Sequence, residues 1–336
     1  MKRLAAALIL VSICLAGVAL CQERRVAART PELERVFGTE RVTIVITDSG
    51  LGGLSIAADA VRRMESEKIF AKADIVFYNA LFSAESGYNS LPDRREKIRI
   101  FDRALRGIEN CCHPDVIVIG CNTLSTIYGE TEFAKRAHIP VIGIVEAGAD
   151  LIARNLAAVP GSRAIIFGTQ TTIEEGSHAA KLAAAGIPGE RIVVQACPDL
   201  TEYIERGYDS EDTGMLIDAY VDEALEKLGK PPGVFFASLN CTHYGYSMKL
   251  WEDAFAALGT SPAAILNPNE ELLDVLFPPR LRGRYEKSTV TVKVVSKVKI
   301  ERDRLESLAG PIRRISPKTA DALMGYEVRE GLFNVD

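Results

Sequence analysis

The stretch Asp115-Val-Ile-Val-Ile-Gly-Cys-Asn-Thr123 joins a run of four β-branched residues to a polar segment. Such a run, apolar on both faces, is typical of a strand that helices cover on both sides, as in a parallel sheet. Cys121 follows the end of this strand after a single glycine. The stretch therefore predicts an α/β fold and places a cysteine at the carboxyl end of a buried strand.

Strand and helix signals alternate on both sides of this stretch. Short runs of apolar, mostly β-branched residues are predicted to be strands, and the amphipathic stretches between them to be helices. The predicted strands cover residues 42–46, 73–77, 115–119, 140–145, 163–167, 191–195 and 233–237. This alternation predicts βα units around mainly parallel sheets.

The second half of the chain repeats the plan of the first. Arg41 and Arg163 begin apolar strands at an offset of 163 − 41 = 122 residues, and Cys121 and Cys241 follow strands at an offset of 241 − 121 = 120. We interpret this as an internal duplication of one α/β lobe, with chance similarity of βα units as the alternative. Two similar lobes are expected, each a mainly parallel sheet flanked by helices, with the active site in the cleft between them.

The domain boundaries follow from this plan. The first lobe is predicted to cover residues 41–146 and the second 147–262. Residues 263–336 form a C-terminal segment that is expected to return to the first lobe. Within it, residues 288–300 alternate as a half-buried strand does, and residues 318–324 have the pattern of a short helix.

The composition is that of an ordinary globular protein. The 336 residues are 47% hydrophobic and 25% charged, which gives enough apolar material for the cores of about two domains. The net charge is −5 and no basic block is present. This balance argues against a nucleic-acid partner.

Residues 1–21 differ from the rest of the chain. A basic pair precedes an apolar run from Leu4 to Leu20, whose end carries small residues. The run is shorter than the ~20 residues of a typical membrane-spanning helix. This pattern predicts a signal peptide, an exported protein that is periplasmic or membrane-associated, and a polar linker at residues 22–40. An uncleaved anchor and a lipid anchor at Cys21 are the alternatives.

Four polar clusters directly follow predicted strands. They are Asp48-Ser49, Cys121-Asn122-Thr123, Thr169 to Thr172, and Cys241-Thr242-His243. Ligands of open α/β sheets bind beyond the carboxyl ends of the strands, so one cysteine from each lobe is expected to flank the same cleft. Racemisation needs this symmetry, because one group removes the Cα proton from one face and another delivers a proton to the opposite face.

The residue types around the cysteines fit this chemistry. A thiol has a reference pKa of about 8.5 and needs help to act as a base. Asp48 is a candidate proton acceptor beside Cys121, and His243 is a candidate relay beside Cys241. The developing carbanion also needs donors that hold the substrate carboxylate. The candidates for this role are Ser49, Asn122, Thr123, Thr172 and Thr242.

No cofactor or metal site is predicted. None of the four clusters contains the lysine that a pyridoxal-phosphate enzyme needs, and the cysteines lack metal-ligand spacing. Cys111, Cys112 and Cys197 are interpreted as packing residues, because buried cysteine most often serves as a small apolar side chain. The predicted partners are an amino-acid substrate and a second copy of the chain in a homodimer.

Three segments resemble the signatures of the glutamate racemase branch of the aspartate/glutamate racemase family. They are Asp48-Ser-Gly-Leu-Gly-Gly-Leu-Ser55, Cys121-Asn-Thr123 and Cys241-Thr-His-Tyr244, in the family's order. Supporting matches are Gly143-Ile-Val-Glu-Ala-Gly148, Gly168-Thr-Gln-Thr-Thr-Ile173 and Ile204-Glu-Arg-Gly207. The resemblance implies a two-lobed α/β fold, no cofactor, and two cysteine thiols as the bases.

The same resemblance implies roles for further residues. Asp48, Glu205 and His243 would assist the cysteines, and the family's Tyr-Gly substrate loop falls at Tyr88-Asn89. The backbone of the substrate would be bound by Ser49, Tyr88, Asn122, Thr123, Thr172 and Thr242. Aspartate-specific members usually have Glu at the position of His243, which favours glutamate. Family members are normally cytoplasmic and supply D-glutamate for peptidoglycan, whereas this chain is predicted to be exported.

Some positions depart from the family's pattern. Asn240 and Thr171 replace glycines, and Gly245 replaces a proline. Glutamate is the predicted substrate because of His243 and the Cys241-Thr-His-Tyr244 match, and these departures leave aspartate or another amino acid as the alternative. A catalytically silent amino-acid-binding protein would also have two lobes, but it gives no reason for cysteines at both strand ends. A decarboxylase that uses one cysteine is a further alternative, and the presence of both cysteines argues against it.

Overall fold

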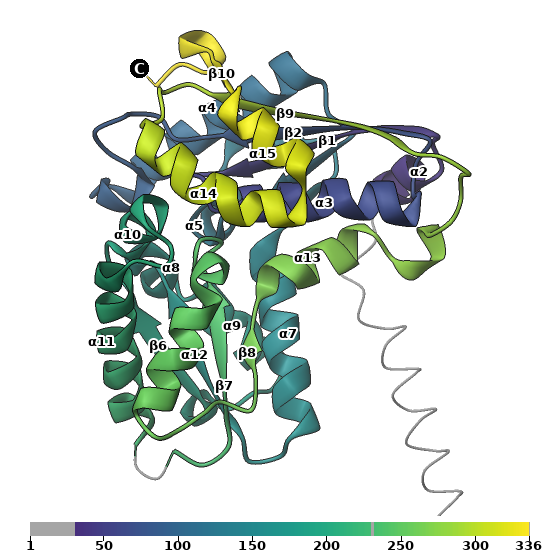
Figure 1. The fold of residues 1–336 in the computed structure, drawn as a ribbon. Coiled ribbons are helices and arrows are strands. Elements are labelled where there is room, and N and C mark those ends of the chain that lie inside the picture. The colour runs from purple at the N-terminus through teal and green to yellow at the C-terminus, as the bar shows by residue number, and fades with distance from the viewer. Residues whose placement is uncertain (1–30, 230–231, 336) are drawn as a thin grey trace, which may run out of the picture.

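The computed structural model describes residues 31–229 and 232–335 and has two α/β lobes, one above the other in Figure 1. The predicted signal peptide at residues 1–21 lies outside the described residues. Within the described ranges, no helix combines the length and the apolar character needed to cross a bilayer.

The first lobe contains a sheet of six parallel strands in the order β10-β9-β2-β1-β3-β4. Its strands are β1 (Arg41–Asp48), β2 (Lys72–Asn79), β3 (Val116–Ile119), β4 (Val141–Gly143), β9 (Thr289–Ser296) and β10 (Glu327–Val328). Side chains of β1 alternate between two cores: Ile44 and Ile46 pack on one face, and Val45 on the other. The continuous apolar run of this strand is thus buried on both sides, as expected for a parallel sheet.

The second lobe contains four parallel strands in the order β6-β5-β7-β8. They are β5 (Arg163–Gly168), β6 (Ile192–Ala196), β7 (Phe235–Asn240) and β8 (Ile265–Leu266). This order matches β2-β1-β3-β4 of the first lobe, so β3 and β7 occupy equivalent places. The second sheet extends past the predicted boundary at residue 262, because β8 pairs with β7.

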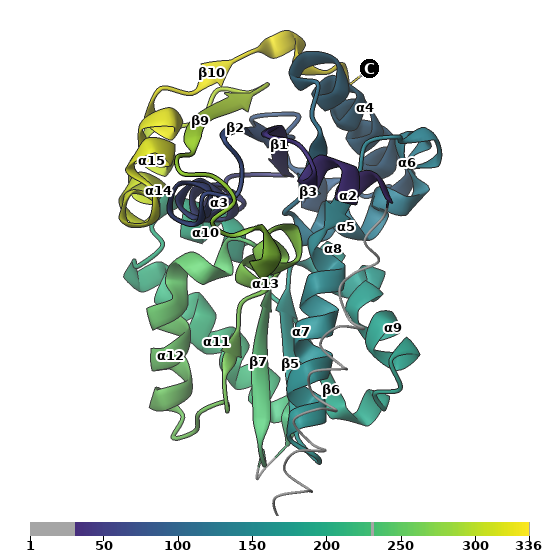
Figure 2. The same cartoon turned by 90° about the vertical axis from the view of Figure 1, so that its right-hand side faces the viewer.

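Helices cover both faces of each sheet (Figure 2). In the first lobe one face packs against α3 (Leu54–Glu67), α13 (Pro268–Leu276), α14 (Arg302–Ile315) and α15 (Pro317–Met324), and the other against α4 (Arg94–Cys112), α5 (Asn122–Ile127) and α6 (Glu132–Arg136). In the second lobe α10 (Leu200–Arg206), α11 (Glu211–Leu228) and α12 (Met248–Ala257) lie opposite α7 (Ile144–Ala158) and α9 (Ser177–Ala184). The short helix α8 (Gln170–Glu175) follows β5.

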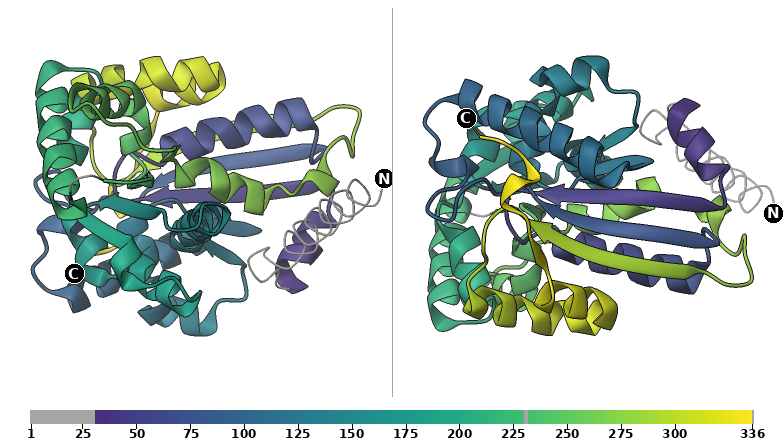
Figure 3. Two further views of the ribbon diagram at one scale, coloured as in Figure 1. Left: turned by 90° about the horizontal axis from the view of Figure 1, so that it is seen from below. Right: turned by 90° about the horizontal axis from the view of Figure 1, so that it is seen from above.

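The C-terminal residues return from the second lobe to the first. Strand β9 pairs with β2 along its whole length, and the view from above in Figure 3 shows it next to β2, with β1 on the other side of β2. Helix α14 then packs against α3 of the first lobe and against α10 of the second. The C-terminal segment therefore contacts both lobes.

Part of the predicted linker is a helix. Residues 31–37 form α2, whose Leu33 and Phe37 are buried in the core of the first lobe. These two residues are four positions apart and thus lie on one helix face. The guanidinium of Arg280 lies over the Phe37 ring at 5.4 Å. The linker prediction failed here because two apolar residues suffice to dock a short helix.

Phe37→Ala is expected to destabilise the protein by about 3 kcal/mol, because it leaves a cavity in a packed core. Urea unfolding followed by circular dichroism measures this change. Arg35→Ala is the matched control on the same helix, since the Arg35 side chain is 75% exposed, and it should change stability by less than about 0.5 kcal/mol. Equal effects of the two substitutions would mean that α2 behaves as a linker in solution.

Candidate active site

The four predicted polar clusters meet where the two lobes join. Thr242, after β7, donates a hydrogen bond of 2.8 Å to Asp48 Oδ2 at the end of β1. Thr123, after β3, lies 3.0 Å from Thr169 and 3.3 Å from Thr172, measured between hydroxyl oxygens. Residues from the two lobes thus form one polar cluster, and Cys121 and Cys241 are buried within it at 5% and 6% exposure.

Cys121 begins helix α5. Its Sγ accepts a hydrogen bond from the backbone N–H of Leu124 at 3.5 Å and lies 3.1 Å from Ser49 Oγ. Burial and the nearby Asp48 carboxylate raise the pKa of the Cys121 thiol, and the hydrogen bonds from Ser49 and Leu124 oppose this only in part. The surroundings of Cys121 thus favour its neutral thiol.

Cys241 contacts His243, which in turn contacts Glu205. His243 Nδ1 lies 3.7 Å from Cys241 Sγ, and His243 Nε2 lies 2.8 Å from Glu205 Oε1. Burial alone would lower the pKa of His243, but its hydrogen bonds to Cys241 and Glu205 outweigh burial and raise that pKa well above its usual value. Burial likewise opposes ionisation of Glu205, yet the contacts with His243 lower its pKa to about 2. His243 and Glu205 thus form a buried ion pair behind Cys241.

Several buried polar atoms of the cluster have no hydrogen-bond partner among the described residues. They are Asp48 Oδ1, the Tyr88 hydroxyl, and both amide atoms of Asn122. Burial raises the pKa of Asp48 above its usual value. Because buried polar groups in native proteins nearly always have partners, these unpaired atoms are candidate contacts for a polar ligand.

The two residues predicted for the substrate loop, Tyr88 and Asn89, lie in different environments in the structure. Tyr88 is buried, with its ring edge-to-face against Phe82 and Phe101. Asn89 is exposed, and the structure does not bring its side chain into the polar cluster. The remaining predicted residues, including Ser49 and Glu205, lie in the cluster or bond directly to it.

Two charged residues near the cluster were not predicted. Lys97 is the one buried lysine among the described residues, and its Nζ donates to Thr171 Oγ1 at 2.9 Å across the lobe junction. It falls on the apolar stripe of α4, three and four residues before Ile100 and Phe101; a charge on such a stripe is the signal that could have identified it. Arg304, from α14, donates to Glu205 Oε2 at 3.0 Å, and no local pattern marks it.

Gly52 permits the close approach of the lobes. A Cβ at this position would overlap Thr242 Oγ1 and His243 Nδ1 of the second lobe. The backbone of the same loop binds the second lobe directly, since the N–H of Leu51 donates to Glu205 Oε1 at 2.9 Å. Gly52 of the first signature segment thus serves close packing across the junction.

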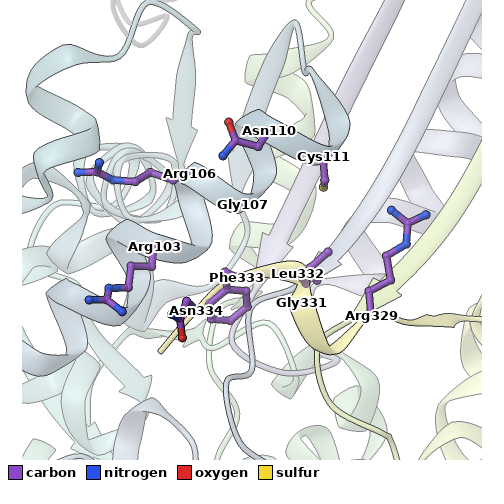
Figure 4. Close-up of a pocket in the computed structure, with 10 residues that line it drawn as sticks. All are labelled: Arg103, Arg106, Gly107, Asn110, Cys111, Arg329, Gly331, Leu332, Phe333 and Asn334. Atoms are coloured by element: carbon purple, nitrogen blue, oxygen red, sulfur yellow. The ribbon is translucent and has the colours of Figure 1, made fainter. Parts of the chain in front are cut away.

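A separate hollow of about 520 Å³ lies between α4 and residues 329–334 (Figure 4). None of the predicted site residues lines it. Cys111 lies in its wall and is exposed, so the interpretation as a packing residue is wrong for Cys111, whereas Cys197 is buried. The last turn of α4 leaves Cys111 at the surface. The described residues contain no group of three metal-ligating side chains.

Relatives of this chain are glutamate racemases. That of Corynebacterium glutamicum is 28% identical over 247 residues, which cover 73% of this chain and 81% of the relative. That of Streptococcus equi subsp. equi is 30% identical over 198 residues, which cover 59% of this chain and 67% of the relative.

Solved structures share the fold. Glutamate racemase from Francisella tularensis, in complex with D-glutamate, is 19% identical with a TM-score of 0.60, and the match covers 86% of this chain and 95% of that one. An isoform from Bacillus anthracis is 20% identical with a TM-score of 0.61, covering 85% and 95%. At these identities the likeness establishes the two-lobed architecture.

The family model of Asp/Glu/Hydantoin racemases matches residues 53–244. This range is more than half of the chain and contains Cys121, Cys241 and the His243–Glu205 pair. The chain therefore belongs to the Asp/Glu/Hydantoin racemase family, a family of isomerases, and within it is similar to glutamate racemases.

Proposed function

We propose that this protein interconverts the L and D forms of an acidic amino acid, glutamate first, with Cys121 and Cys241 as the two bases. The observation that carries the proposal is the placement of the cysteines: each follows an equivalent strand, β3 or β7, and both lie in one buried polar cluster. Family membership and the glutamate racemase relatives support the choice of reaction.

The proposed reaction moves one proton off Cα and another onto it. The thiolate of one cysteine takes the proton, so the Cα–H bond breaks, an S–H bond forms, and the electron pair stays on the substrate. The thiol of the other cysteine then protonates the opposite face. For the reverse direction the roles exchange, and the relays at Asp48 and His243 return the protons to their starting positions.

In the proposed reaction, the bound substrate helps Cys121 to form its thiolate. Burial favours the neutral thiol of Cys121, and a bound ammonium group beside it favours the thiolate. The proposed donors to the substrate's α-carboxylate are the unpaired amide of Asn122 and the hydroxyls of Ser49, Thr123 and Thr172. Thr242 contributes its backbone N–H, because its hydroxyl already donates to Asp48. These donors stabilise the negative charge that develops when the Cα proton leaves.

Lys97 supports an acidic side chain on the substrate. Lys97 is buried at the lobe junction, and the one hydrogen-bond acceptor that the described residues give its Nζ is the Thr171 hydroxyl. A buried cation is costly unless an anion pairs with it. A distal carboxylate of the substrate is the anion that we propose.

The test of the proposed function is a panel of L-amino acids incubated with the purified, reduced protein and analysed by chiral chromatography. Formation of D-glutamate at the highest kcat/KM in the panel is expected. Turnover of another amino acid but not of glutamate contradicts the substrate and leaves the mechanism standing. Tight binding of an amino acid without any racemisation contradicts the enzyme and favours the binding-protein alternative.

Lys97→Met is expected to lower kcat/KM for glutamate by about 10- to 100-fold, since it removes a charge-assisted hydrogen bond. Glutamine, which has no distal charge, should be affected far less. Lys135→Met is the control, because Lys135 is 61% exposed on α6. Equal losses for glutamate and glutamine would contradict a role of Lys97 in recognising the distal carboxylate.

A further inference from the structure

The C-terminal segment contributes a cation to the back of the active site. Helix α14 packs against α10, the helix that carries Glu205, and the two are neighbours in Figure 1. Arg304 of α14 is 19% exposed and Glu205 is 9% exposed, and Arg304 Nη1 donates to Glu205 Oε2 at 3.0 Å. This contact joins residues 99 positions apart in the chain.

The two oxygens of Glu205 have different partners. Oε1 lies 2.8 Å from His243 Nε2 and accepts a hydrogen bond from the backbone N–H of Leu51, whereas Oε2 is bound by Arg304. A carboxylate held at both oxygens cannot rotate freely, so Oε1 stays directed at the imidazole. Arg304, Glu205, His243 and Cys241 are thus joined, each to the next, by side-chain contacts. These contacts run from the C-terminal segment to a proposed catalytic thiol.

Arg304 is itself held in place. Its Nε donates to Glu301 at 3.1 Å, and its Nη2 lies 3.4 Å from Glu202 of α10. Three carboxylates thus orient one guanidinium, which matches the planar fork of donors that arginine presents. Because Glu202 and Glu301 are half exposed or more, water screens them, and the buried Glu205 interacts most strongly with Arg304.

We propose that Arg304 is a positioning residue of the racemase: it keeps Glu205 ionised and directed at His243, and thereby sets the proton affinity of the relay behind Cys241. This inference rests on the proposed function. A positive charge at Glu205 Oε2 reduces the pull of that carboxylate on the imidazole proton, so His243 can release the proton to the thiolate of Cys241 and take it back. Without Arg304, Glu205 would hold the imidazolium more tightly.

The effect expected from removing Arg304 depends on the charged groups around Arg304, Glu205 and His243. The titratable and charged groups near Arg304, Glu205 and His243 are Asp48, Glu202, Arg206, Cys241, Tyr246 and Glu301. Removal of the arginine charge makes the net charge around His243 more negative, and this raises the proton affinity of His243. The limb of the kcat/KM pH profile that reflects the titration of the His243–Glu205 pair should therefore move to higher pH.

The experiment compares Arg304→Met, Arg304→Gln and Arg304→Lys in the full chain. Both neutral variants are expected to lower kcat/KM about tenfold and to move that limb up by roughly half a pH unit to one unit. Arg304→Lys should restore most of the activity and of the profile. Arg302→Met is the control, since Arg302 is on the same helix, is 80% exposed and pairs with Glu306; its profile should match the wild type.

The outcomes separate the two proposals. A wild-type protein that racemises no amino acid overturns the proposed function. If the wild type is active and Arg304→Gln folds with an unchanged pH profile, the positioning role alone is overturned. The same holds if the variant loses activity while its pH profile stays unchanged and Arg304→Lys does not restore the activity. If Arg304→Met fails to fold, the glutamine variant, which keeps a hydrogen-bond donor, decides the question.

Discussion

Replacing either Cys121 or Cys241 by alanine is expected to slow racemisation by at least about 10³-fold in both directions, as loss of an essential acid–base group does. Every turnover needs a proton donor on one face of Cα and an acceptor on the other, so neither thiol is dispensable. Because the two enantiomers have the same free energy in solution, kcat/KM must fall by the same factor in each direction. Circular dichroism of the reaction mixture, started from each enantiomer, measures both rates.

The two alanine variants should differ in a partial reaction. The thiol that remains can still remove the Cα proton from the enantiomer whose Cα–H faces it, and exchange it with solvent. In deuterated water, Cys121→Ala and Cys241→Ala are therefore expected to exchange opposite enantiomers, as followed by proton NMR. The intact enzyme should place solvent deuterium mainly in the product enantiomer, because a different group delivers the proton.

Cys197→Ala is the control for these variants. Cys197 is also buried, but it lies outside the polar cluster, so its removal should leave the rate within a few-fold of the wild type. The two-thiol mechanism fails if either Cys121→Ala or Cys241→Ala retains near wild-type racemisation in both directions.

Gly52→Ala is expected to lower kcat/KM by about 10²-fold or more. The added Cβ overlaps Thr242 Oγ1 and His243 Nδ1, so the first lobe must shift away from the second or both side chains must move. A displacement of about 1 Å at a reacting group can cost 10²-fold in rate. The loss should appear mainly in kcat, with steady-state kinetics as the measurement.

A glycine-to-alanine substitution away from the lobe junction is the control for Gly52→Ala. Gly129 has no atoms within 4 Å of the place where a Cβ would stand, so Gly129→Ala should be nearly neutral. The thermal unfolding midpoint of each variant separates misplacement from unfolding. A folded Gly52→Ala protein with wild-type kcat would show that the lobes need not approach as closely as this structure has them.

Local sequence was sufficient for the strands and for the residues that follow them. The apolar run before Cys121 predicted β3 within one residue, since a strand buried on both faces has no polar positions that break the run. The run at residues 140–145 was less decisive. The strand β4 ends at Gly143, and Ile144 and Val145 begin α7, because a short apolar run does not distinguish a strand from the first turn of a buried helix.

Contacts between distant segments could not be predicted in the same way. Lys97 and Thr171 are 74 positions apart, and Arg304 and Glu205 are 99. Neither pair has a shared pattern, because each depends on how two separately formed elements pack. The family resemblance led to Glu205, but Arg304 lies in the C-terminal segment, where no signature matched. Exposure of Asn89 likewise depends on the path of its loop, which residue types alone do not determine.

The return of β9 to the first sheet makes that lobe discontinuous in the chain. Lys72 of β2 pairs with Thr289 of β9, a separation of 289 − 72 = 217 residues. As the chain is synthesised, β2 therefore remains an edge strand with unpaired backbone groups until the whole second lobe has emerged, and such edges are prone to mispairing. Pairing over this separation is also slow. The sheet of the first lobe is thus completed only after the second lobe has been synthesised, and the same holds for the contact between Arg304 and Glu205.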